Sequence, residues 1–227
     1  MDPKHRDRLA FVKIVSGTFK RNTPYLHVRH KKKFKFSSPN AFFAEKKEIV
    51  EESFPGDIVG LHDTGNFKIG DTLTEGEILN FKGIPSFSPE HFRYVNNADP
   101  LKSKQLYKGL DQLMDEGVAQ LFTLDLNGRK IIGTVGALQY EVIQYRLEHE
   151  YGAKCTYENI HVHKACWVEA EDEKNEEFKE FKRVKQRYLA KDKQGQLVFL
   201  ADSPFTIQMT QQKYPTVKLH FTSEFDN

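Results

Sequence analysis

The first third of the chain alternates short apolar segments with turn residues, and no helical repeat persists from Leu9 to about Phe81. Strands of this length at regular spacing predict a small closed β-barrel, because closure leaves no unpaired sheet edge. The first segment, residues 9–15, is apolar at nearly every position. We therefore expect this strand to bury both of its faces inside the barrel.

The pattern changes near Gly83, where we place the boundary between a barrel domain, residues 1–82, and an α+β domain, residues 83–227. Asp99-Pro100 is typical of a helix start, because aspartate caps free amides and proline fits the first helical position. The helix that follows is expected to bury a leucine face, made by Leu106, Leu110 and Leu113.

Asn127-Gly128 lies between two apolar segments and predicts a tight hairpin. A second helix is expected from Ala137 to Tyr151, and its spaced apolar positions predict the buried face: Leu138, Val142 and Tyr145. With one strand before the first helix and one after the second, the order is β-α-β-β-α-β. This order predicts a ferredoxin-like core over residues 86–159.

Residues 160–227 are expected to form an α+β extension of that core. A charged helix is predicted from Asn175 to Arg187, with an apolar stripe of Phe178, Phe181 and Val184. Strands are predicted at 197–200 and 217–221, while 205–212 fits either a strand or a helix. The sequence shows no internal repeat.

Composition places the chain among ordinary globular proteins, with 38% hydrophobic and 29% charged residues. The formal net charge of +2 conceals a basic N-terminal part, since residues 1–50 hold 13 Lys and Arg against 4 Asp and Glu. Two cysteines and no apolar leader argue against a secreted disulfide scaffold and predict a reduced, cytoplasmic protein. No apolar run has the length of a membrane span, so no membrane partner is expected.

The most concentrated positive charge lies in one short segment of the predicted barrel. Such a segment suits phosphate groups, because neutralising several phosphates releases counterions and gives sequence-independent affinity. The same composition is typical of a simple solvated loop, and that interpretation stays open. The candidate phosphate-contacting residues are Arg29, His30, Lys31, Lys32, Lys33 and Lys35.

Three other clusters are interpreted as structural. His161, His163 and Cys166 alternate as metal ligands would, but a closed zinc site needs a fourth ligand, so we expect no metal. The acidic run from Glu169 to Glu173, with Glu176 and Glu177, is expected to be a solvated helix start rather than a catalytic pair. Trp167 is expected to anchor a core, in preference to stacking on RNA.

Several separated motifs resemble segments of the translational GTPases. Asp2-Pro3 before the first strand resembles the start of the second, barrel domain of that family. Two later segments resemble its closing part, FPGDIVGL at 54–61 and IGDTL at 69–73. In these corners Gly56 and Gly70 permit turns, and Asp57 and Asp71 are expected to accept hydrogen bonds from nearby amides.

The segment GTVGALQYEV at 133–142 resembles the strand-to-helix junction of the third domain of these factors. Its form, together with Trp167-Val168-Glu169 and the segment YPTVK at 214–218, is most similar to bacterial peptide chain release factor 3. The resemblance spans nearly the whole chain. It implies a ribosome-binding fragment that, in translation termination, promotes dissociation of the codon-reading release factors.

The resemblance also implies partners. These are rRNA and small-subunit protein surfaces of the ribosome, the codon-reading release factors indirectly, and the protein's own GTPase domain in a longer chain. A monomer is expected, and the six basic residues named above would then contact rRNA.

We expect the family's GTPase domain to be absent from this chain, because neither Gly-x-x-x-x-Gly-Lys-Ser/Thr nor Asn-Lys-x-Asp occurs in it. No catalytic residue and no cofactor are therefore expected here. The resemblance implies GTP or GDP with magnesium for the missing domain.

Two alternatives stay open. An equivalent fragment of elongation factor G or of a ribosomal protection protein would have the same domain order, although its motifs differ from Trp167 onward. A small phosphatase on the ferredoxin-like fold would need a glycine-rich phosphate loop after the first strand. Asn96-Asn97-Ala98 instead leads directly into a helix cap.

Overall fold

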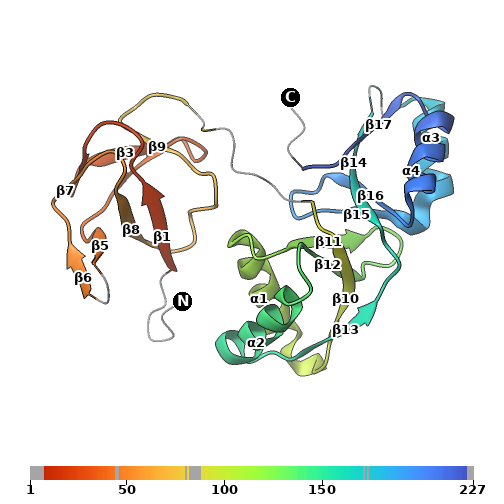
Figure 1. The fold of residues 1–227 in the computed structure, drawn as a ribbon, viewed down its shortest axis with the longest axis horizontal. Helices are drawn as coiled ribbons and strands as arrows, with labels where there is room; N and C mark the ends of the chain where they lie inside the picture. Colours follow the sequence, from red (N-terminus) through yellow and green to blue (C-terminus); the bar gives the residue numbers. More distant parts are fainter. Residues whose placement is uncertain are drawn as a thin grey trace. The chain divides into compact units, whose positions relative to one another are not determined.

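The computed structural model describes residues 8–43, 46–79, 81, 88–170, 172 and 174–223. The chain divides into two compact units, Met1–Ile84 and Pro85–Asn227 (Figure 1). Some segments interpreted above lie outside the described residues: Asp2-Pro3, the boundary residues 82–85, and Glu171 and Glu173 of the acidic run.

The Met1–Ile84 unit consists of short antiparallel strands in three sheets. Their sheet orders are β1-β8-β5-β6, β4-β3-β9 and β2-β7. The strands are β1 Arg8–Lys13, β2 Phe19–Lys20, β3 Pro24–His27, β4 Lys32–Lys35, β5 Asn40–Phe43, β6 Lys46–Ile49, β7 Glu52–Ser53, β8 Ile58–Asp63 and β9 Leu73–Thr74. The described part of this unit contains no helix, as the alternating pattern predicts.

One apolar cluster holds these sheets together, and it includes Ile14, Phe19, Tyr25, Phe36, Val59 and Leu61. The rings of Phe19 and Tyr25 stack with their centroids 5.0 Å apart. The expectation that the first strand buries both faces is wrong, because Phe11 is 64% exposed while Ile14 is buried. In an antiparallel sheet one face commonly packs on the core while the other is solvated, and Phe11 of β1 lies on the solvated face.

The two predicted barrel corners have the expected geometry. Gly56 and Gly70 have φ of 103° and 90°, a region that side chains with a Cβ rarely adopt. At the first corner the Asp57 carboxylate accepts a hydrogen bond from the Phe54 amide over 2.8 Å. At the second, Asp71 accepts one from the Lys68 amide over 2.7 Å, which confirms the role assigned to both aspartates.

The Pro85–Asn227 unit contains one eight-stranded sheet and four α-helices, counted over its described residues (Figure 1). The first half comprises β10 His91–Asn97, η1 Pro100–Lys102, α1 Ser103–Asp115, β11 Gln120–Leu124, β12 Lys130–Thr134, α2 Gln139–Tyr151 and β13 Cys155–Asn159. The second half comprises β14 Lys164–Ala170, α3 Glu176–Lys185, η2 Gln186–Tyr188, β15 Leu189–Lys191, β16 Leu197–Ala201, α4 Pro204–Lys213 and β17 Val217–His220.

The sheet order is β13-β10-β12-β11-β15-β16-β14-β17, and every neighbouring pair is antiparallel. The first half has the ferredoxin-like order predicted for the core. The second half, β14-α3-β15-β16-α4-β17, repeats the same order of elements and of strands. The expected extension is therefore a second ferredoxin-like half, joined to the first where Thr123 and Leu124 pair with Lys191 and Ala190.

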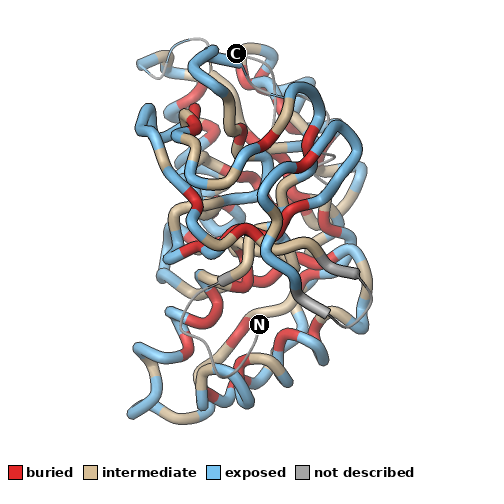
Figure 2. The backbone as a smooth tube through the Cα atoms, turned by 90° about the vertical axis from the view of Figure 1, so that its left-hand side faces the viewer, coloured by how far each residue is buried: buried red, intermediate tan, exposed pale blue. Residues whose placement is uncertain are grey.

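Three apolar clusters of described residues fill this unit. Figure 2 shows the buried positions in red, recurring along the chain. One cluster joins α1 and α2 to the sheet, and a second joins α3 and α4 to it. The third combines residues of both halves, including Phe122 and Trp167, whose rings lie 6.1 Å apart. The Trp167 indole N–H donates to Asp192 over 2.9 Å, and this buried position confirms Trp167 as a core anchor.

The helix after Asp99 begins as predicted. The Asp99 carboxylate accepts a hydrogen bond from the Leu101 amide over 3.0 Å, in front of η1 and α1. All three leucines of the expected face are buried, which confirms it: Leu106, Leu110 and Leu113.

The buried face predicted for α2 is wrong. Leu138 is 73% exposed, and Val142 and Tyr145 are also exposed. The buried residues are instead Tyr140, Ile143 and Leu147. Both faces of this helix are apolar, and the interior contacts decide between them: the Tyr140 hydroxyl donates to the Ile132 carbonyl over 3.1 Å within the core.

The charged helix α3 docks on the sheet through Phe178 and Phe181, as its apolar stripe predicts, but Val184 is exposed. The Asn175 side chain caps it by accepting the Glu177 amide over 3.0 Å. The Glu177 carboxylate in turn accepts the amide and hydroxyl of Thr216, over 2.9 and 2.8 Å. This acid is therefore a structural tie between α3 and the start of β17, not only part of a solvated helix start.

Candidate nucleic-acid interface

The basic segment forms the β3–β4 hairpin and the turn that joins its strands. His27 pairs with Lys32 at the last register position. The Lys31 amide donates to the Val28 carbonyl over 3.2 Å, and Lys31 has a φ of 54°. A tight turn therefore closes the hairpin, with Lys31 in the left-handed region that non-glycine residues adopt mainly in turns.

The four lysines of this segment are exposed: Lys31, Lys32, Lys33 and Lys35. In β4, alternation places Lys33 and Lys35 on the face opposite Phe34, which packs against the barrel core. No aspartate or glutamate occurs between Arg29 and Ala44. The hairpin therefore offers a cluster of ammonium groups with no acidic residue within the same stretch of sequence.

Arg29 and His30 have different surroundings from the lysines. The Arg29 guanidinium forms two hydrogen bonds with the Asp71 carboxylate, over 2.6 and 2.7 Å, and a third with the Asn66 carbonyl, over 2.7 Å. The His30 Nε2 lies 3.1 Å from the same carbonyl. These two residues therefore hold the turn against the loop before β9, and the charge offered outward comes from the lysines.

A buried histidine connects this ion pair to the aromatic part of the barrel. The His27 side chain is fully buried, and its Nε2 lies 3.1 Å from an Asp71 carboxylate oxygen. Its ring centroid lies 5.0 Å from that of Phe67 and 5.6 Å from that of Phe34. The hairpin is thus fixed from inside by His27 and from outside by Arg29, with Asp71 between them.

The two ionisable groups in this contact have shifted pKa values. Burial lowers the pKa of His27 below its usual value, although the nearby Asp71 charge opposes that shift. Burial alone would raise the pKa of Asp71, but hydrogen bonds from Arg29 and from the Lys68 amide outweigh it and hold the pKa below its usual value. Both shifts favour neutral His27 beside ionised Asp71.

Sequence reasoning misses the positioning roles of His27 and Asp71. The sequence indicates Asp71 only as a corner residue of the IGDTL segment, and it gives His27 no role. The sequence gives little indication that Asp71 pairs with Arg29, because the two residues are 42 positions apart in the chain. Two features of the sequence point to this ion pair: the charged Asp71 in a corner motif of the family, and a cationic hairpin in the same barrel.

The residues of the rejected metal site do not share one environment. Cys166 is fully buried in the sheet, whereas His161 and His163 are exposed. Burial raises the pKa of the Cys166 thiol to about 12, so it remains a thiol at neutral pH. Among the described residues, no group of three or more histidine, cysteine or acidic side chains is arranged to hold a metal ion.

The first strand of the ferredoxin-like core also differs from a phosphatase site. The Arg93 guanidinium lies over the Tyr140 ring, 4.6 Å from its centroid. β10 ends at Asn97, whose side chain accepts a hydrogen bond from the Asp99 amide over 3.0 Å at the start of the helix cap.

Within the described part of the chain, no helix has the length and apolar character needed to cross a membrane.

Comparison with known proteins gives two family matches in series. Residues 1–76 match the model for elongation factor G domain 2, and residues 81–211 match the model for class II release factor RF3, C-terminal domain. Both are translation-factor domains. Neither match is to a GTPase domain.

A solved structure provides an independent comparison of the fold. A crystal structure of a protein from Thermus thermophilus superposes with a TM-score of 0.57 and 16% sequence identity. The likeness covers 71% of this chain and 25% of that one, so this chain spans about a quarter of the length of the protein it resembles. At this identity the likeness concerns the fold alone.

These comparisons confirm the predicted fold class, a barrel-type domain followed by an α+β domain. The release factor match extends over more than half of the 227 residues. It includes Trp167-Val168-Glu169, one of the segments that distinguish this family from elongation factor G, and ends before the YPTVK segment at 214–218. The chain therefore belongs to the class II release factor RF3 family, with an elongation-factor-G-type second domain preceding its C-terminal domain.

Proposed function

We propose that this chain is a ribosome-docking part of a class II release factor, which in termination promotes dissociation of the codon-reading release factors after peptide release. The match of residues 81–211 to the C-terminal domain of that family carries the proposal. The preceding second-domain match supports it, because two translation-factor domains follow one another in a single chain. The setting is the cytoplasm, where the ribosome is the direct partner.

The physical work of such a part is differential binding, not covalent chemistry. A factor can shift the ribosome between two states only by as much as it binds one state more tightly than the other. In the complete factor, a GTPase domain with GTP or GDP and magnesium would set when that preference acts. This chain would supply surfaces that read the ribosomal state, as a monomer and without nucleotide turnover.

For the barrel unit, we propose that the β3–β4 hairpin contacts rRNA through its four exposed lysines. Counterion release makes such contacts strong and dependent on salt concentration. The anchoring of the turn by Arg29 and Asp71 supports this role, since a fixed hairpin loses less conformational freedom on binding. The proposal assigns Arg29 and His30 to positioning the hairpin, and Lys31, Lys32, Lys33 and Lys35 to the phosphates.

Cosedimentation with ribosomes, combined with a GTPase assay, tests the proposed function. We expect the chain to pellet with 70S-type ribosomes in a saturable manner and to show no GTP turnover above that of the ribosomes alone. Absence of saturable pelleting would contradict the docking role. GTP turnover that increases with the concentration of this chain would contradict the assignment of catalysis to another domain.

A further inference from the structure

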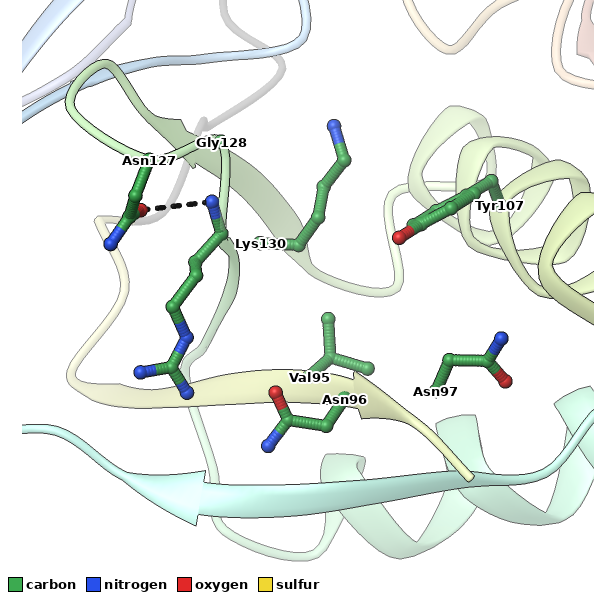
Figure 3. Close-up of a pocket in the computed structure, with 8 residues that line it drawn as sticks. Val95, Asn96, Asn97, Tyr107, Asn127, Gly128 and Lys130 are labelled. Carbon is green, nitrogen blue, oxygen red and sulfur yellow. Dashed lines mark hydrogen bonds between the residues drawn. The ribbon is translucent and has the colours of Figure 1, made fainter. Parts of the chain in front are cut away.

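A shallow cavity lies in the Pro85–Asn227 unit, between the end of β10, Tyr107 of α1 and the β11–β12 turn (Figure 3). Its volume is about 230 Å³. This is smaller than the pockets of several hundred Å³ that enclose whole small molecules. A cavity of this size suits one group that protrudes from a larger partner. The residues that give it chemical character are Asn96, Asn97, Tyr107, Asn127, Arg129 and Lys130.

The lining of this Tyr107 cavity combines an aromatic ring with positive charge and contains no acidic residue. Tyr107 is 49% exposed, and the Lys130 ammonium lies 5.9 Å from its ring centroid. Figure 3 shows Tyr107 and Lys130 bordering the same open space at the end of β10. The Lys130 ammonium also donates to the Thr123 hydroxyl over 2.9 Å, which holds the charge in place.

The other polar groups of the Tyr107 cavity are also held before any partner binds. The Arg129 guanidinium lies over the Tyr94 ring, 3.5 Å from its centroid, and forms an ion pair with Glu158. The Asn97 amide donates to the Ser103 hydroxyl over 2.7 Å. Side chains fixed in this way lose little rotational freedom when a ligand arrives.

We propose that the Tyr107 cavity binds one unpaired RNA nucleotide, with its base against the Tyr107 ring and its phosphate near Arg129 and Lys130. Proteins recognise unpaired RNA mainly by stacking bases on aromatic rings and by pairing phosphates with cations. The Asn97 amide is engaged by Ser103 and by the Asp99 amide, so the donors and acceptors for a base edge would come from Asn96 and Asn127. An acidic peptide would use the cations but not the exposed ring face.

This assignment deepens the proposed function, because the ribosome is a source of unpaired RNA, and it concerns a surface separate from the hairpin lysines. The signal that sequence reasoning passed over was two cations, Arg129 and Lys130, directly after the Asn127-Gly128 turn. Tyr107 joins them only through the packing of α1 on the sheet.

Fluorescence anisotropy with a labelled single-stranded RNA of about ten nucleotides tests the cavity directly. The full chain is used with Lys31, Lys32 and Lys33 replaced by glutamine, so that hairpin binding does not mask the signal. We expect Tyr107→Ala to raise the Kd roughly 5- to 150-fold, the range observed for loss of one stacked base. Tyr107→Phe should bind almost as well as the parent, because it keeps the ring.

Two further variants sharpen the test. Lys130→Gln should reduce the dependence of log Kd on log salt by about 0.7, the contribution of one single-strand phosphate. Tyr145→Ala is the matched control, since Tyr145 is an exposed aromatic residue of α2 outside the cavity, and its Kd should equal that of the parent. Buried Trp167 reports by its fluorescence that each variant is folded.

The proposal is overturned if Tyr107→Ala and the parent bind the RNA equally. It is also overturned if Tyr107→Ala weakens pelleting with ribosomes but leaves RNA binding unchanged, since a protein would then occupy the cavity. Failure of the proposed function is distinguishable: a chain that does not pellet with ribosomes, yet loses RNA affinity with Tyr107→Ala, contradicts ribosome docking and supports the cavity.

Discussion

Replacement of Lys31, Lys32 and Lys33 by glutamine is expected to reduce the salt dependence of ribosome binding. The change removes three of the four exposed positive charges that the β3–β4 hairpin carries on its lysines. These side chains form no ion pair with any residue that the structure describes, so their replacement breaks no described ion pair. The fold should therefore persist while the phosphate contacts are lost.

The magnitude follows from the number of charges. Each phosphate contact contributes about 0.7 to 0.9 to the slope of log affinity against log salt, so three contacts contribute roughly 2 to 3. Between about 50 mM and about 200 mM salt, the unmodified chain should lose roughly 20- to 40-fold more affinity than the triple variant. Lys35 remains in the variant and should preserve part of the slope.

The assay is cosedimentation with ribosomes over a salt series. The matched control replaces Lys174, Arg187 and Lys191 by glutamine, because these exposed cations of the Pro85–Asn227 unit have the same total charge. The control should keep the slope of the unmodified chain. Equal slopes for all three proteins would refute the reasoning, and the hairpin would then be a solvated loop.

The remaining predictions concern stability. Asp71→Asn should lower the free energy of unfolding of the barrel unit by about 2 kcal/mol, since it removes the charged acceptor of the hydrogen bonds from Arg29 and from the Lys68 amide, and hydrogen exchange over residues 24–35 should reveal it. Because the folded pKa of His27 lies below 6.5, its contribution to stability is present above pH 6.5 and falls as the pH drops toward the folded pKa. Protection factors over residues 24–35, which correct for the slower intrinsic exchange at lower pH, should therefore fall from about pH 7 to about pH 5, and His27→Phe should abolish that fall. Gly109→Ala should destabilise the other unit by about 1–2 kcal/mol, as its Cβ would lie 2.7 Å from Leu147 Cδ2; urea unfolding followed by Trp167 fluorescence measures this, and unchanged stability would contradict it.

Gly136→Ala is the matched control for the last of these, since a Cβ there would meet no atom within 4 Å. The chain has one tryptophan, Trp167, which is buried in the Pro85–Asn227 unit. Its fluorescence therefore reports only that unit and should be unaffected by Asp71→Asn. A shift of the Trp167 transition in Asp71→Asn would contradict the local role of the Asp71 contact.

Local signals in the sequence predicted local structure well. The corners at Gly56 and Gly70 and the turn at Gly128 need backbone conformations that few residue types adopt. The Asp99 and Asn175 caps need a short side chain whose oxygen accepts a free helix amide. These features can be predicted from the sequence because they depend on interactions between residues only a few positions apart.

The orientation of α2 could not be read in the same way. Leu138, Val142 and Tyr145 have helical spacing, but so do Tyr140, Ile143 and Leu147, and periodicity cannot choose between two apolar faces. The choice depends on contacts with distant residues. Leu147 packs at Gly109 of α1, where the missing side chain leaves room for it.

The repeated topology of the second unit was hidden for a related reason. Its central pairing uses β15, a strand of only three residues, Leu189–Lys191, which follows the short helix η2 directly. A segment so short carries no alternating pattern. The repeat exists in the order of elements and strands, and not in the sequence, so the strand pairings β15-β16-β14-β17 reveal it.

For the candidate site, the sequence identified the cations but not their different roles. Lys31, Lys32, Lys33 and Lys35 could be found from charge alone, because exposed lysines need no partner. The internal role of Arg29 depends on Asp71 and on the Asn66 carbonyl, which the fold brings to it from a distant part of the chain. Long-range ion pairs of this kind require the tertiary structure.

Competition for post-release ribosomes tests the central claim most directly. The rate at which a labelled codon-reading release factor leaves such ribosomes is measured with an intact class II release factor and GTP, while this chain is added in increasing excess. We predict that the chain occupies the docking surface, slows the departure in proportion to its occupancy, and causes none by itself. An unchanged rate at a concentration where the chain saturates the ribosomes, or departure driven by the chain alone, would contradict the claim.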